Sequence, residues 1–263
     1  MYARKQLDFS YRDLIAAVGH ALRPGIRCQP VVSDLESLWS REDNAVVALS
    51  VRTAFDAYLS VLKLPRGSEV VMTGINIPDM VQIVNEHGLA IVPVDLDMRT
   101  LEVKPAALKK AITPNTRLVV AAHLFGARMD MDPVFEAVKG RDDIRVVEDC
   151  AQAFRGIDQY TGDARSDISL FSFGSIKTAS ALGGAMARIQ DSKMCEALKQ
   201  HLAAYPRRGR AGFIWRVMKY GFLKTLGQPT IYGLFVRLCR LFNLDFDEII
   251  IASVRNFKCD ELL

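Results

Sequence analysis

Lys177 and Asp149 are the two residues whose side chains and spacing most directly suggest chemistry. Lys177 follows an apolar run in the segment Phe-Gly-Ser-Ile-Lys-Thr, and Asp149, 28 positions upstream, ends the strand-like run Ile-Arg-Val-Val-Glu-Asp. A lysine amine can form a Schiff base with an aldehyde cofactor, and a carboxylate at a strand end can keep a pyridine nitrogen protonated. The pair suggests a pyridoxal phosphate (PLP) enzyme, although a solvated lysine and a helix-capping aspartate are the ordinary interpretations of each residue alone.

Short apolar runs alternate with helical patterns along the chain, which is typical of a mostly parallel sheet sandwiched by helices. The first 40 residues read as helical pieces with a break at Arg23-Pro24-Gly25. Seven strands are expected at 45–49, 69–73, 90–94, 117–122, 144–148, 167–172 and 184–189, and helices between them at 53–62, 78–87, 105–111 and 132–138. The predicted fold class is therefore α/β, with a short helical C-terminal segment.

The candidate residues fall where such a sheet places its ligands. In an open α/β sheet, ligands bind beyond the carboxyl ends of the strands, and Asp149, Ser172 and Lys177 lie at or just after expected strand ends. Thr53 stands at the start of the first helix of the sheet region, where backbone N–H groups and the helix dipole favour a phosphate. Its neighbour Arg52 is either a direct phosphate donor or a solvated charge.

Several ordered motifs make the chain resemble the sugar aminotransferases of the DegT or StrS type, within the aspartate aminotransferase fold. The resemblance begins near Ala45, ends at the Gly183-Gly184 pair and depends on the order of the motifs. They are Gly-Ser-Glu-Val-Val-Met (67–72), Ala-Ile-Val-Pro-Val-Asp (90–95), Thr-Pro-Asn-Thr-Arg-Leu-Val-Val (113–120), His-Leu-Phe-Gly (123–126), Glu-Asp-Cys-Ala-Gln-Ala (148–153) and Phe-Ser-Phe (171–173).

The resemblance implies a role for each candidate residue. Lys177 would bind PLP covalently and move protons, and Asp149 would pair with the pyridine nitrogen. Ser172 and Thr53 would hold the cofactor phosphate, and Gln152 would contact the side of the ring that carries the phenolic oxygen. His123 reads as a structural histidine and stays outside the catalytic set.

Three positions depart from the family pattern and leave the substrate open. Arg52 replaces the usual glycine before Thr53, Ile77 stands where an aromatic residue usually stacks on the pyridine ring, and the loop after Lys177 lacks the common glutamate. Isoleucine covers a ring by dispersion, without the quadrupole of an aromatic side chain. These departures predict a divergent branch of the family.

The reaction that the resemblance implies is transfer of an amino group from an amino acid donor to a keto-sugar nucleotide or similar carbonyl acceptor, as in amino sugar biosynthesis. A PLP-dependent dehydratase of the same fold usually lacks the lysine, so Lys177 argues against it. The alternative from another class is an inactive protein of this fold that binds a membrane or a partner. The departures at Arg52 and Ile77 and the short C-terminal region favour that alternative, whereas Asp149, Ser172 and Lys177 oppose it.

Composition places the chain among globular proteins. It has 263 residues, of which 50% are hydrophobic and 24% charged, and no apolar segment follows Met1, so we expect a cytoplasmic enzyme without a secretory signal. The five cysteines are scattered without a Cys-x-x-Cys pair, which argues against a disulfide framework, and no metal site is expected.

The C-terminal region has a charge pattern of its own. Residues 206–244 contain eight Lys and Arg but no Asp or Glu, interleaved with aromatic and aliphatic residues. Such helices can pack on the sheet domain, form the interface of a homodimer, or lie peripherally on an anionic membrane. We expect mainly a homodimer interface; nucleic acid is not expected, because no binding motif accompanies the charge. The expected domains are a helical segment (1–40), a PLP-binding domain (41–200) and a basic helical tail (201–263), shorter than the small domain of such enzymes.

Overall fold

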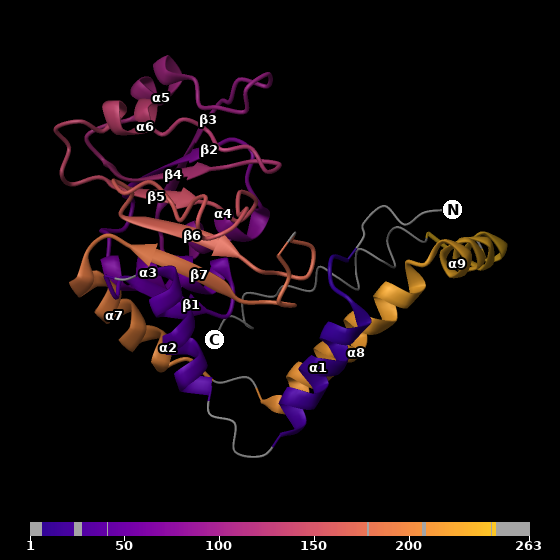
Figure 1. Cartoon of the computed structure of the whole chain (residues 1–263). Coiled ribbons are helices and arrows are strands. Elements are labelled where there is room, and N and C mark those ends of the chain that lie inside the picture. The colour runs from indigo at the N-terminus through magenta and orange to yellow at the C-terminus, as the bar shows by residue number, and fades with distance from the viewer. Residues whose placement is uncertain are drawn as a thin grey trace. The chain divides into compact units, whose positions relative to one another are not determined.

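The computed structural model describes residues 7–23, 28–40, 42–177, 179–206, 209–242 and 244–245. These residues divide into two compact units (Figure 1). One unit contains the sheet and comprises 27–173 and 183–205. The other, called here the helical unit, comprises the described residues within 1–26, 174–182 and 206–263. The domain boundaries expected from the sequence stay a prediction.

The sheet unit has seven strands in the order β1-β7-β6-β5-β4-β2-β3 (Figure 1). The strands are β1 (Ala45–Ala48), β2 (Glu69–Thr73), β3 (Ala90–Val94), β4 (Thr116–Ala122), β5 (Arg145–Asp149), β6 (Ile168–Ser172) and β7 (Ala185–Ile189). Strand β7 pairs antiparallel with both β1 and β6, and the other pairings are parallel. The predicted α/β class and mostly parallel seven-stranded sheet are confirmed.

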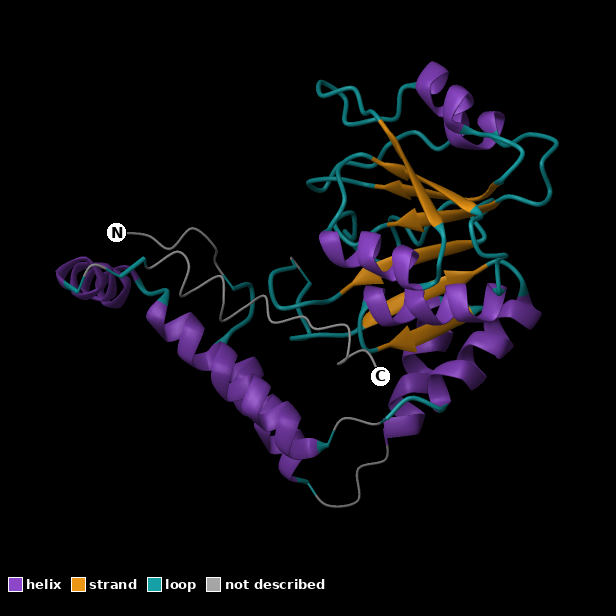
Figure 2. Ribbon diagram, turned by 180° about the vertical axis from the view of Figure 1, so that it is seen from behind, coloured by secondary structure: helices purple, strands orange, loops and turns teal. Residues whose placement is uncertain are grey.

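Helices cover the sheet, and several lie across the face that Figure 2 turns to the viewer. The helices of this unit are α2 (Cys28–Trp39), α3 (Val51–Leu62), α4 (Pro78–Glu86), α5 (Pro105–Ala111), α6 (Asp132–Ala137) and α7 (Ser192–Ala203). Proline at the first turn starts α4, α5 and α6, where its missing N–H costs no hydrogen bond. Strand β4 is buried almost throughout, as expected for a central parallel strand covered on both faces.

Apolar cores hold the strands that matter for the site. One of them packs Leu108 of α5 and Val134 of α6 against side chains of β2, β4 and β5. A second core is aromatic: the ring of Trp39 lies 5.0 Å from that of Phe171 and 5.5 Å from that of Phe154. Phe171 directly precedes Ser172, so this core holds the carboxyl end of β6 in place.

The helical unit contains α1 (Tyr11–Leu22), α8 (Arg210–Leu226) and α9 (Pro229–Leu241). Helix α1 begins with a capping box, in which Ser10 and Asp13 satisfy each other's backbone N–H groups. The predicted break at Arg23-Pro24-Gly25 falls partly outside the described residues; Arg23, which is described, ends α1 with an extended backbone.

Candidate active site

The carboxyl ends of six strands meet at one edge of the sheet. Strands β2 to β6 run parallel, and β1 shares their direction because it and β6 both pair antiparallel with β7. Ser172 pairs with Ala185, which pairs with Ala48, so the end of β6 lies two strands from the end of β1. Asp149 and Ser172 therefore come to the same edge as the start of α3.

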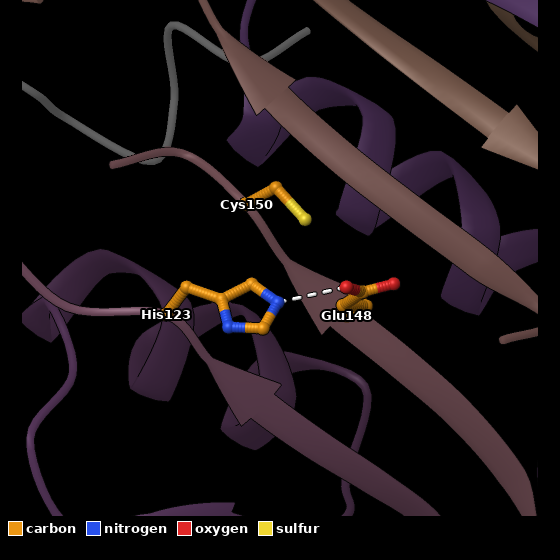
Figure 3. Close-up of side chains that lie close together, drawn as sticks. All are labelled: His123, Glu148 and Cys150. Atoms are coloured by element: carbon orange, nitrogen blue, oxygen red, sulfur yellow. Dashed lines mark hydrogen bonds and ion pairs between the residues drawn. The ribbon is translucent and has the colours of Figure 1, made fainter. Parts of the chain in front are cut away.

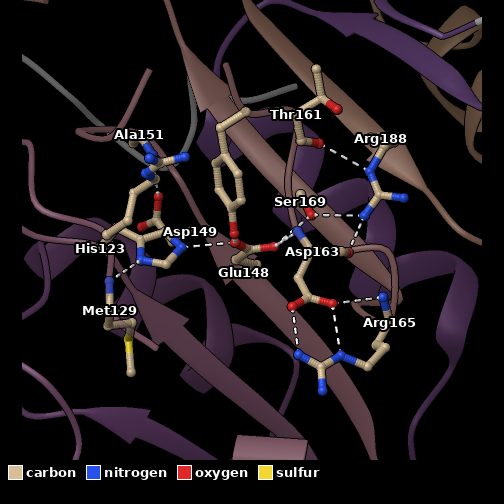
Figure 4. Close-up of polar contacts among 12 residues, drawn as sticks. His123, Met129, Glu148, Asp149, Ala151, Thr161, Asp163, Arg165, Ser169 and Arg188 are labelled. Atoms are coloured by element: carbon tan, nitrogen blue, oxygen red, sulfur yellow. Dashed lines mark hydrogen bonds and ion pairs between the residues drawn. The ribbon is translucent and has the colours of Figure 1, made fainter. Parts of the chain in front are cut away.

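Asp149 is the last residue of β5 and is held from both sides. It pairs with Ala122 of β4 and Leu170 of β6, and its carbonyl accepts the N–H of His123 at 3.0 Å. Its buried carboxylate accepts the N–H of Ala151 at 2.9 Å through Oδ1 (Figure 4). The strand ladder thus gives this carboxylate a fixed position at the binding edge.

The N-terminus of α3 has the geometry of an anion site. Ser50 caps the helix: its Oγ accepts the N–H of Thr53 at 3.1 Å and lies 2.9 Å from the Thr53 hydroxyl oxygen. A helix N-terminus concentrates N–H donors and positive dipole, which favours a phosphate. From the sequence, Arg52 is either a hydrogen-bond donor to the phosphate or a solvated charge. In the structure its guanidinium forms a 2.5 Å ion pair with Asp79 in the first turn of α4.

Gln152 braces the neighbouring loop. Its side-chain Oε1 accepts the N–H of Phe125 at 3.0 Å, which ties the residues after β5 to the residues after β4. Phe125 and Gly126 both have positive φ, at 53° and 84°, so the loop turns sharply there. The contact of Gln152 with a cofactor ring stays a prediction, and the structure adds a local reason for an amide at this position.

Ser172 and Lys177 belong to different units. Ser172 is half-buried at the end of β6. Lys177 lies in a turn of the helical unit, half-buried, and its N–H donates to the carbonyl of Gly174 at 3.0 Å. The pairing of Lys177 with Asp149 therefore rests on the sequence motif. Ile77 precedes α4 as its N-cap residue and has a largely accessible side chain, 45% exposed.

Below the edge, a buried network surrounds Glu148, the neighbour of Asp149 (Figure 4). Its side chain is fully buried and accepts four hydrogen bonds. Oε1 accepts from His123 Nε2 at 2.7 Å and from the Tyr160 hydroxyl; Oε2 accepts from the Asp163 N–H at 2.8 Å and the Ser169 hydroxyl at 2.9 Å. The loop between β5 and β6 approaches Ser169 so closely at Gly162 that a Cβ added to this glycine would lie 2.1 Å from Ser169 Oγ.

These hydrogen bonds decide the charge of Glu148. Burial alone raises the pKa of a carboxyl, but the donors His123, Tyr160 and the Asp163 N–H outweigh it and lower the pKa of Glu148 to about 2. Burial of Tyr160 raises the pKa of its hydroxyl, and the hydrogen bond to the Glu148 carboxylate raises it further. Glu148 is therefore an ionised hydrogen-bond acceptor at neutral pH, and Tyr160 donates to it.

His123 is locked as one tautomer. Its Nδ1 accepts the N–H of Met129 at 3.0 Å, so the ring proton must sit on Nε2, which donates to Glu148. Cys150 lies close by (Figure 3), and burial, followed by the charges of Glu148 and Asp149, raises the pKa of its thiol. A metal ion would need a deprotonated thiol and a free ring nitrogen, so this geometry favours a hydrogen-bond network over a metal site. The interpretation of His123 as structural agrees with this geometry.

Sequence reasoning missed the role of Glu148. Its signal was present, because the sequence places a glutamate inside an apolar strand, where an ionised side chain needs several donors. The donors Tyr160, Asp163 and Ser169 come from a loop and a strand that no local pattern connects to β5. The network fixes the carboxyl end of β5 and with it the position of Asp149.

A family model defines the class of protein. Residues 35–216 match the DegT/DnrJ/EryC1/StrS aminotransferase family, and the chain belongs to this family. The match includes the whole sheet, Asp149, Ser172 and Lys177.

Solved structures of similar fold agree. CalS13, a sugar aminotransferase from Micromonospora echinospora, is 26% identical with a TM-score of 0.62, over 76% of this chain and 57% of that chain. Spr1654 from Streptococcus pneumoniae, solved in a PLP form, is 22% identical with a TM-score of 0.66, over 77% of this chain and 57% of that one. The E. coli GDP-4-keto-6-deoxy-D-mannose-3-dehydratase is 18% identical with a TM-score of 0.62, over 75% of this chain and 54% of that one. The chain thus matches little more than half the length of these proteins.

Proposed function

We propose that this chain is the PLP-binding part of an aminotransferase that moves an amino group from an amino acid to a keto-sugar nucleotide or similar carbonyl compound. The observation that carries the proposal is the position of Asp149. A buried carboxylate, fixed by strand pairing at the binding edge, suits a protonated pyridine nitrogen better than it suits a surface salt bridge. Family membership and the PLP form of Spr1654 support the cofactor.

The residues at the edge fit the rest of the cofactor. The capped N-terminus of α3 offers N–H donors and the Thr53 hydroxyl to a phosphate, and Ser172 offers a second hydroxyl. Arg52, whose charge is paired with Asp79, would lie near the phosphate at the start of the same helix. Gln152 would contact the ring while its amide oxygen holds the loop of Phe125.

Lys177 and Asp149 have different roles in the proposed reaction. Bound PLP supplies an aldehyde for amines and an electron-withdrawing ring. Lys177 would hold the cofactor through its amine and, once the amino donor has displaced it, would move a proton between the donor Cα and the cofactor C4′. Asp149 would keep the ring nitrogen protonated. A dehydratase of this fold is a second outcome to consider, because one solved neighbour has that activity, but the lysine at position 177 favours transamination.

We further propose a cytoplasmic homodimer, since PLP sites of this fold lie near a subunit boundary. Light scattering of the purified chain measures its mass directly, and a monomer at all concentrations would contradict the dimer.

The decisive test of function is a half-reaction. The purified protein is loaded with PLP, and its visible spectrum is recorded before and after adding L-glutamate without an acceptor. Loss of the cofactor absorbance together with one equivalent of 2-oxoglutarate is expected, and Lys177→Ala should bind PLP without this reaction. The proposal would be contradicted if PLP stays bound and neither glutamate nor any other amino acid tested as a donor changes the spectrum. That result would favour a binding role.

A further inference from the structure

Among the residues that the structure describes, the helical unit packs on one face of α8. Helices α1 and α8 run antiparallel, because the Tyr11 hydroxyl lies 3.0 Å from Thr225 Oγ1 at one end and Arg210 donates to the Arg23 carbonyl at 3.0 Å at the other. The buried seam between them contains Leu14, Val217, Tyr220 and Leu182.

The opposite face of α8 is apolar and open to solvent. Trp215, Met218 and Phe222 are 73%, 60% and 67% exposed. Their spacing of three and four residues places them on one stripe of the helix. Large apolar side chains on the water-exposed face of a helix normally mark a surface that something covers.

Helix α9 repeats the pattern. Tyr232, Val236 and Cys239 are its buried residues. A second stripe, spaced three, four and three residues apart, is exposed and entirely aliphatic: it consists of Ile231, Leu234, Leu238 and Leu241. Both helices are therefore apolar on two faces, one of which faces solvent.

The charge of these helices is of one sign. No Asp or Glu occurs between 206 and 244. On α8, Arg216 and Lys224 donate to the backbone carbonyls of Leu182 and Leu7 within the unit. On α9, Arg237 and Arg240 are exposed beside the aliphatic stripe.

We propose that the exposed faces of α8 and α9 bind the surface of an anionic lipid bilayer, with the helices lying in the interface. Apolar stripes with an exposed tryptophan, flanked by arginine and lacking acidic residues, match the acyl boundary and the negative headgroups of such a surface. No described helix is long and apolar enough to cross a membrane.

A second copy of the chain fits this surface less well. A two-fold interface brings the same patch together from both subunits, so Arg237 and Arg240 of each subunit would approach those of the other, and no carboxylate of 206–244 would pair with them. We therefore place the homodimer contact, which the sequence predicts in 206–244, outside that segment.

Tryptophan fluorescence tests the proposal directly. The chain has two tryptophans, and Trp39 is buried in the sheet unit, so Trp39→Phe leaves Trp215 as the only emitter. Vesicles of phosphatidylglycerol mixed with phosphatidylcholine should shift its emission to the blue, and brominated acyl chains should quench it. Pure phosphatidylcholine should do neither, and high salt should reverse the shift.

Paired variants separate charge from a general change of the protein. Arg237→Gln with Arg240→Gln should weaken partitioning into anionic vesicles about 30-fold, as two basic side chains near the surface predict. The matched control is Lys109→Gln with Lys110→Gln on α5, which removes the same charge from exposed positions of the sheet unit and should leave partitioning unchanged.

The apolar stripe has a control of the same kind. Trp215→Ser with Phe222→Ser should reduce vesicle binding, measured by co-sedimentation, at least tenfold. Met98→Ser, at an exposed methionine of the sheet unit, should not. Equal loss of binding in both variants would contradict the assignment.

Two results would overturn the proposal. In the first, the emission of Trp215 is already blue-shifted without vesicles and shifts to the red on dilution, while light scattering shows a dimer dissociating; this result would assign the surface to a second copy of the chain. In the second, the emission maximum is that of a water-exposed tryptophan, and anionic vesicles at low salt leave it unchanged.

Discussion

Replacing Glu148 with glutamine should destabilise the fold at neutral pH by an amount that the structure sets. The carboxylate accepts hydrogen bonds from His123, Tyr160, Ser169 and the Asp163 N–H, and both oxygens are used twice. The glutamine side chain keeps one oxygen as an acceptor and has an NH2 group in place of the other, so this NH2 group faces two hydrogen-bond donors. Hydrogen bonds are lost at that oxygen, and buried donors are left without partners.

The magnitude follows from the pKa. The pKa of Glu148 falls from 4.5 to about 2 in the folded protein, and each pKa unit corresponds to roughly 1.4 kcal/mol. The ionised carboxylate therefore contributes on the order of 3 kcal/mol at neutral pH. Because the folded pKa is the lower one, this contribution is present above pH 4.5 and is lost as the pH falls towards 2.

Urea unfolding followed by circular dichroism measures the free energy of unfolding between pH 7 and pH 3. Glu148→Gln should lower it by about 3 kcal/mol at pH 7, and the difference from the wild type should shrink below pH 4.5. Glu86→Gln, at an exposed glutamate, is the control and should change stability by less than about 0.5 kcal/mol. A Glu148→Gln protein as stable as the wild type at pH 7 would show that the ionised carboxylate does not stabilise the fold, as would a stability difference that is independent of pH.

Three further changes probe the site itself. Asp149→Asn should keep the fold and bound PLP but slow amino transfer by about a hundredfold, or about 3 kcal/mol, in single-turnover kinetics; near-normal turnover would make Asp149 structural. Ser50→Ala removes the cap of α3 and should cost about 1 kcal/mol of stability by urea unfolding, together with weaker binding of inorganic phosphate by calorimetry; unchanged stability would contradict the capping role. Gln152→Ala should raise the amide exchange rate of Phe125, whose N–H loses its acceptor, and an unchanged rate would show that the brace is dispensable.

Much of the sheet could be predicted because its local patterns are strong. The run at 69–73 and the run at 90–94 were expected as strands with the bounds that the structure has, and α5 likewise at 105–111. Parallel strands buried on both faces give continuous apolar runs, and proline marks the first turn of α4, α5 and α6. Asp149 and Ser172 were expected at or just after strand ends, and they are the last residues of β5 and β6 in the structure, although the strand expected at 144–148 stops one residue before Asp149.

Partners distant in sequence could not be predicted. Arg52 pairs with Asp79, 27 residues away, and Gln152 with the backbone of Phe125. Such contacts depend on how two loops meet at the sheet edge, and no periodicity encodes them. The charge bias of 206–244 was visible in the sequence, whereas the side of α8 that stays exposed depends on its packing with α1.

Borohydride reduction of the PLP-loaded protein shows whether Lys177 carries the cofactor. Peptide mapping by mass spectrometry then identifies the residue that carries the pyridoxyl group. We expect a single modification at Lys177, which is absent in Lys177→Arg. A pyridoxyl group on another lysine in the native protein, or none while PLP stays bound, would contradict it.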